Sequence, residues 1–224
     1  MKKSFSICVV MATVFVLLSV SACSLKDAKG VLAKADAQVE QNNDGVAKKS
    51  IDIKASELMA LFIEWSPKAW LELTERMGWK VYGRDILRQE DLSMDLFTKG
   101  IDYDASTDKF KKETADGSCL AMLDHEVDGP SWELMLADKA DYEALMAEMS
   151  SEKEYKEDIE MLKSLNESPD SHFDKVFMKA VYDEDLSKMA GKKLGVGYYI
   201  IFEGERGGLY IVSFSHGNGD VDME

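Results

Sequence analysis

The chain has 224 residues, of which 27 are basic and 42 acidic, so its formal net charge is −15 at pH 7. Such a charge repels the phosphates of nucleic acids and anionic lipid head groups, so we expect no nucleic acid among its partners. A chain of this length has room for one domain with an apolar core.

The N-terminus has the three parts of an export signal. Two lysines follow the first methionine, an apolar stretch runs from Phe5 to Val20, and the small residues Ser21 and Ala22 come next. We therefore predict that residues 1–22 are a signal peptide.

The segment Val20-Ser21-Ala22-Cys23 resembles the lipobox of bacterial lipoproteins. The resemblance implies that a diacylglycerol is joined to the thiol of Cys23, that the preceding peptide is removed, and that the protein is attached to a membrane through acyl chains such as palmitate. With Ser24 as the second mature residue, it also implies a place in the cell envelope, on the periplasmic side of the outer membrane where the source has two membranes.

Two alternatives to lipid attachment remain at this stage. The uncharged run continues to Leu25, so it could just span a bilayer of about 30 Å as an uncleaved helix. A plain secretory signal, cleaved after Ala22 without lipidation, is the other.

The predicted mature chain has 202 residues and a net charge of −17, because the signal removes two lysines and no acidic residue. Cys8 is lost with the signal and Cys23 carries the lipid, so only Cys119 remains and no internal disulfide can form. Residues 23–50 lack aromatic side chains and are predicted to be a flexible tether. A polar helix over Ala28–Val39 is the alternative.

Helical periodicity begins after Ile51. Residues 56–65 are predicted to form an amphipathic helix capped by Ser56, with Trp65 on its apolar face. Ser66-Pro67 begins a second helix that Gly78 ends, and residues 91–97 suggest a short third one.

Strand-like runs follow. Cys119–Leu123, Trp132–Leu136, Lys109–Glu113 and Lys175–Tyr182 are separated by turn dipeptides. Gly197–Glu203 and Leu209–Phe214 form a predicted hairpin around Gly204–Gly208, with Ile200 facing the core.

Two further helices are predicted between these strands. Asp138 or Asp141 caps the first, which carries Tyr142, Leu145 and Met149. The second begins at Glu152 and carries Tyr155, Ile159 and Leu162 on one side.

These elements indicate an α+β fold, with helices packed on an antiparallel sheet. The predicted domain covers residues 51–216, and residues 217–224 form a polar tail.

No catalytic motif stands out. Ser215 and His216 are neighbours on a strand and point to opposite faces, which argues against a nucleophile and its base.

The alternating polar row from His216 to Glu224 is better explained as the polar tail than as metal ligands. A predicted turn carries weak metal candidates, although a solvated acidic tip is the better explanation. These candidates are Asp124, His125, Glu126 and Asp128. No cofactor is indicated.

Two features point to a protein partner. Trp65, Trp70 and Trp79 lie within fifteen residues, and tryptophan is enriched at the energetic centres of interfaces, although these rings also fit a core. Acidic side chains on the predicted 152–160 helix could steer a basic partner. They are Glu152, Glu157 and Glu160.

We therefore expect a lipid-anchored, non-enzymatic envelope protein that binds or protects another envelope protein. A periplasmic hydrolase and a solute-binding domain, each with site residues scattered in the sequence, are the alternatives.

Overall fold

The computed structural model describes residues 51–126 and 129–223. The predicted signal peptide, lipidated cysteine and tether lie outside these residues. The helices are α1 (Ala55–Ile63), α2 (Pro67–Met77), α3 (Lys139–Ser151), α4 (Ile159–Leu165) and α5 (Glu184–Ala190). The strands are β1 (Lys80–Gln89), β2 (Leu92–Lys99), β3 (Ile101–Asp104), β4 (Lys109–Lys112), β5 (Ser118–His125), β6 (Gly129–Leu136), β7 (Lys156–Glu157), β8 (Lys175–Asp183), β9 (Leu194–Arg206) and β10 (Leu209–Asp222).

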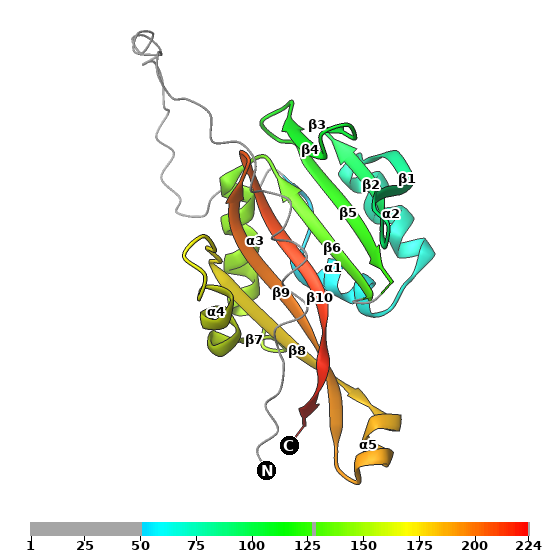
Figure 1. The fold of residues 1–224 in the computed structure, drawn as a ribbon, viewed down its shortest axis with the longest axis vertical. Helices are drawn as coiled ribbons and strands as arrows, with labels where there is room; N and C mark the ends of the chain where they lie inside the picture. Colours follow the sequence, from blue (N-terminus) through cyan, green and yellow to red (C-terminus); the bar gives the residue numbers. More distant parts are fainter. Residues whose placement is uncertain (1–50, 127–128, 224) are drawn as a thin grey trace. The chain divides into compact units, whose positions relative to one another are not determined.

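Eight strands form one sheet in the order β1-β2-β5-β6-β10-β9-β8-β7 (Figure 1). Every neighbouring pair is antiparallel, and β3 and β4 form a separate hairpin. The α+β class with helices on an antiparallel sheet is therefore confirmed.

One face of the sheet packs against α1, α2 and α3. Because strand side chains alternate, every second residue of the central strands points to this face. Leu134, Val212, Ile200 and Phe202 do so, and all are fully buried. The prediction that Ile200 faces the main core is confirmed.

The opposite face has a smaller apolar cluster under the β3–β4 hairpin. Ile101 and Tyr103 from β3 pack with Leu96, Cys119 and Met135 of the sheet. Ile201 of β9 also points to this face and is buried. Because β9 pairs on both sides and is buried on both faces, it is a central strand.

The helix α2 begins and ends at local signals, whereas α1 begins without one. Ser66 caps α2 by accepting a hydrogen bond from Ala69 N, Pro67 is its first residue, and Gly78 ends it at a φ of 65°. All three assignments are confirmed. The helix α1 begins one residue before Ser56, and its N-cap Lys54 makes no side-chain capping bond, so the predicted Ser56 cap is wrong.

The β9–β10 hairpin turns at two residues. Gly207 and Gly208 both have positive φ, which suits the tight turn of a twisted hairpin. Gly204, expected in the loop, lies instead at a bulge of β9. β10 continues to Asp222, so residues 217–222, expected in the polar tail, belong to this strand.

Two predicted helices are wrong. Residues 92–97 belong to β2, because they pair with both β1 and β5. The helix expected from Glu152 is absent because residues 156–157 pair with β8, and Asp158 then caps α4 by accepting a hydrogen bond from Met161 N.

The ends of β8, β9 and β10 extend beyond the rest of the sheet, with α5 at their tip (Figure 1). Asp183 caps α5 and Gly191 ends it. Residues 194–197 are the first part of β9.

Candidate functional site

An aromatic cluster lies where α1 and α2 meet the sheet. Its centre is Trp132 of β6, whose ring lies 5.3 Å from Phe62, 5.9 Å from Trp70 and 6.2 Å from Trp65, measured between centroids. Tyr198 of β9 completes the group at 6.3 Å from Phe62. We call these five residues the aromatic patch.

Trp65 is the exposed member of the patch. Its exposure is 53%, although its ring lies 5.5 Å from Trp70. Trp70 and Trp79 are only 6% and 7% exposed, so they belong to the core and cannot be the partner contacts that the sequence suggested. The Trp79 indole donates a hydrogen bond to the hydroxyl of the buried Ser118 at 2.9 Å.

The position of Trp65 follows from the junction of two helices. The helix α1 ends at Ile63, and Ser66 caps α2, so Trp65 lies in the short link between them. The residue before the proline adopts an extended backbone, as prolines favour. The indole thus rests on the rings below with one side in water.

Carboxylates border the aromatic patch. Glu64 and Asp124 are exposed, and Asp95 is partly buried. Asp95 pairs with Met122, which pairs with Trp132, so Asp95 lies on the same sheet face as the indole. Two cations also lie beside the patch, since Arg84 is 3.9 Å from Asp95 and Lys179 pairs in register with Tyr198.

The three glutamates expected on one helix do not share a face. Glu152 ends α3, Glu157 lies on β7 and Glu160 lies in the first turn of α4. Glu157 also forms an ion pair with Lys175 at 3.4 Å. They are surface charges on three elements and do not form the predicted steering helix face.

The weak metal candidates between β5 and β6 do not converge. Asp124 and His125 are adjacent on β5, so their side chains point to opposite faces. His125 Nε2 lies 3.0 Å from Asp91 Oδ2, and Asp128 lies outside the described residues. Within residues 51–126 and 129–223, no three His, Cys, Asp or Glu side chains are grouped as metal ligands would be.

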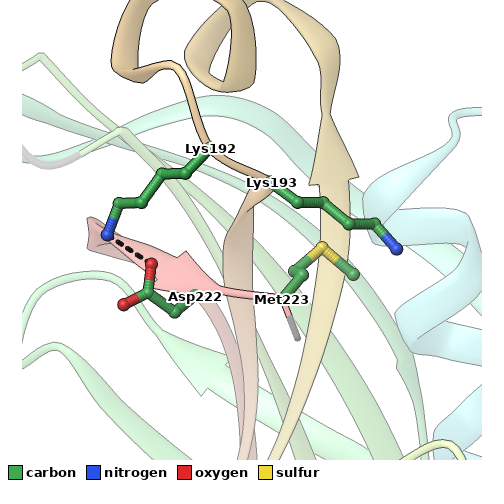
Figure 2. A pocket seen from close by; sticks show the side chains of 4 residues that line it. All are labelled: Lys192, Lys193, Asp222 and Met223. Carbon is green, nitrogen blue, oxygen red and sulfur yellow. Dashed lines mark hydrogen bonds and ion pairs between the residues drawn. The ribbon is translucent and has the colours of Figure 1, made fainter.

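A small hollow lies in the extended part of the sheet (Figure 2). Its volume is about 240 Å³, and an ion pair between Lys192 and Asp222 crosses it. Lys193 and Met223 complete its lining. The polar groups of the hollow are thus two amines and one carboxylate, and the Lys192 amine is paired with that carboxylate.

The sequence analysis missed a pair of charged residues on the second sheet face. Glu133 of β6 and Glu203 of β9 have side chains that are 12% and 16% exposed. A single guanidinium, that of Arg206, lies 3.7 Å from Glu133 Oε1 and 3.6 Å from Glu203 Oε2. The sequence signal was a carboxylate within one apolar run, Trp132–Leu136, and another at the end of a second run, Gly197–Glu203.

Comparison of the chain with protein families, curated proteins and solved structures finds no match. Among the helices of residues 51–126 and 129–223, none has the length and apolar character that crossing a bilayer requires.

Cys119 is fully buried in β5, and burial together with the charge of Glu133 raises the pKa of its thiol. Since the thiolate is the reactive form, we expect no reaction with a thiol reagent in the folded protein at pH 8 and full reaction in denaturant. The absorbance of the chromophore that the thiol reagent releases measures the extent of reaction in both conditions. Rapid labelling of the folded protein would contradict the burial of this side chain.

Proposed function

We propose that this protein is a lipid-anchored envelope protein that binds another envelope protein through Trp65, the exposed member of the aromatic patch. The observation that carries the proposal is the half-exposed indole of Trp65, held by the buried rings of Trp70 and Trp132. A rigid aromatic anchor of this kind loses little side-chain entropy on binding, and tryptophan is enriched among the residues that dominate interface energies.

The surrounding charge suggests the chemistry of the partner. The exposed Glu64 and Asp124 border the aromatic patch, and the predicted mature chain has a net charge of −17. A partner segment with lysine or arginine side chains would complement these carboxylates. Its cationic groups could also lie against the exposed indole face, an interaction worth about 0.5–1 kcal/mol at an exposed site.

The edges of the sheet favour recognition through side chains over strand addition. The pairing of β1 has three register shifts, and Asp85 in this strand has a φ of 52°. At the other end of the sheet, β7 has only two residues. Bulges and very short edge strands oppose the pairing of a further chain.

The N-terminal features support the attachment to a membrane. Small residues before Cys23 follow an apolar run, as in the lipobox, and residues 24–50 would give the domain a reach of roughly 30 Å as a flexible coil. Such a tether would let the aromatic patch reach partners near the membrane surface.

Trp65→Ala tests the proposal against the matched control Leu71→Ala. Leu71 is 61% exposed on α2 and lies outside the aromatic patch. The partner is first captured from detergent-solubilised envelopes. We expect Trp65→Ala to lower the affinity for this partner by about thirtyfold, or about 2 kcal/mol. Leu71→Ala should change the affinity less than twofold. Titration of the purified pair measures both affinities.

The captured partner must also bind more weakly as salt increases. If the Trp65→Ala and Leu71→Ala variants bind the partner with equal affinity, or if Trp65→Ala binds it as tightly as wild type, the proposed role of the aromatic patch is overturned.

A further inference from the structure

Two glutamates on the second face of the sheet lie beside one guanidinium. Arg88 of β1 makes two hydrogen bonds to the carboxylate of Asp108, at 2.9 and 2.7 Å, and is therefore committed to it. Tyr103 donates a further hydrogen bond to the same carboxylate at 2.8 Å. This leaves Arg206 as the cation that lies between Glu133 and Glu203.

The backbone holds the two glutamates on this face. Glu133 pairs in register with Ser213 of β10, and Glu203 lies at the bulge where the β9–β10 register shifts. The Ser213 hydroxyl donates a short hydrogen bond to Glu203 Oε1. The bulge and this hydroxyl hold Glu203 towards Glu133, and neither carboxylate can turn freely into water.

The surroundings oppose a second negative charge. Burial, followed by the charge of Glu133, raises the pKa of Glu203 above its ordinary value of 4.5, while Arg206 and the Ser213 hydrogen bond act in the opposite sense. The neighbouring charged and titratable groups are Arg88 and Cys119 near Glu133, Tyr142 near Glu203, and Arg206 between the two glutamates. Asp108 binds Arg88, and Asp174 accepts a hydrogen bond from Tyr142.

We propose that Glu203, which lies with Glu133 beside the Arg206 guanidinium, takes up a proton and forms a proton-sensitive element on the second face of the sheet. With the proton bound, Arg206 balances one remaining carboxylate. When the proton leaves to water, two carboxylates in a mostly buried site share one guanidinium, which destabilises the contact between β6 and the β9–β10 hairpin. This inference does not depend on the aromatic patch.

The direction of the pH effect follows from linkage. A carboxyl group with a raised pKa in the folded state gives a stability that is complete below its unfolded value of 4.5. That stability is lost as the pH rises through the folded value. Within this window one proton changes the folding equilibrium constant about tenfold per pH unit. Acid therefore stabilises the domain through this pair.

Urea unfolding of the full chain between about pH 4.5 and pH 8 tests the inference. Glu203→Gln imitates the protonated acid, so we expect it to remove the decline that wild type shows above pH 4.5. The matched control Glu75→Gln removes an exposed carboxylate of α2 and should keep the wild-type decline. A Glu203→Gln variant that declines as wild type does would overturn the proposal.

Two further variants protect the test against a misfolded Glu203→Gln protein. Glu133→Gln should also remove the decline, because either amide leaves one carboxylate for Arg206. The double variant should be less stable than both single variants at pH 8, since Arg206 then faces no carboxylate of the pair. A double variant as stable as the single variants would contradict the sharing of this cation.

Discussion

Replacing Trp132 with alanine should lower the free energy of unfolding by about 3–5 kcal/mol, the usual cost of removing a large buried aromatic ring. Trp132 is 4% exposed, and the rings of Phe62, Trp65 and Trp70 all lie against it. Its loss would leave a cavity between β6 and the α1–α2 junction that these rings cannot fill without moving. Equilibrium unfolding in urea measures the effect.

Trp65→Ala is the control for this prediction. It removes the same side chain from a site that is half exposed, so we expect a loss of less than about 1 kcal/mol. Similar losses for the two variants would mean that Trp65 supports the core as Trp132 does. In that case the indole of Trp65 would have a structural role and the aromatic patch would lose its anchor.

Cys23→Ser should abolish lipidation and leave an unlipidated precursor that still carries residues 1–22. The reason is chemical, because the lipid is joined to a thiol and a serine hydroxyl cannot replace it in that reaction. Intact-protein mass spectrometry gives the state of the N-terminus, and fractionation of the envelope gives the location.

Cys8→Ser is the matched control, since it changes a cysteine within the predicted signal peptide. This variant should be processed, lipidated and attached as the wild type is. If Cys23→Ser is instead cleaved and fractionates with the membrane like its parent, the lipoprotein hypothesis is wrong.

Elements with local signals at both ends could be predicted from the sequence. The helix α2 has a serine cap, a proline at its first position and a glycine at its end, and each signal acts within a few residues. The β9–β10 hairpin combines β-branched and aromatic runs with Gly207-Gly208, whose positive φ values suit a two-residue turn.

Elements defined by distant partners could not be predicted. Residues 92–97 carry apolar side chains at spacings that suit a helix as well as a strand. Pairing with β1 and β5 decides between them, and no local signal reports it. The same holds for the start of the helix expected from Glu152, where the spacing of Tyr155, Ile159 and Leu162 predicted a helix but residues 156–157 pair with β8.

The candidate site shows the same division. Trp65, Trp70 and Trp79 could be grouped from the sequence, but their exposure depends on packing against β6. Trp132, the centre of the aromatic patch, is more than fifty residues away in the sequence and reaches the other rings only through the sheet. Glu133 and Glu203 likewise meet only because β10 lies between their strands.

Site-specific photo-crosslinking in cells of the source organism tests the binding role of the aromatic patch most directly. A photoreactive phenylalanine at position 65 of the full-length protein should form a discrete adduct with one envelope protein, and the same group at position 71 should not. Adduct formation should fall when the cells are washed at high salt, because the exposed Glu64 and Asp124 would contribute to the contact. Identical adducts from positions 65 and 71, or none from position 65, would contradict a partner contact at Trp65.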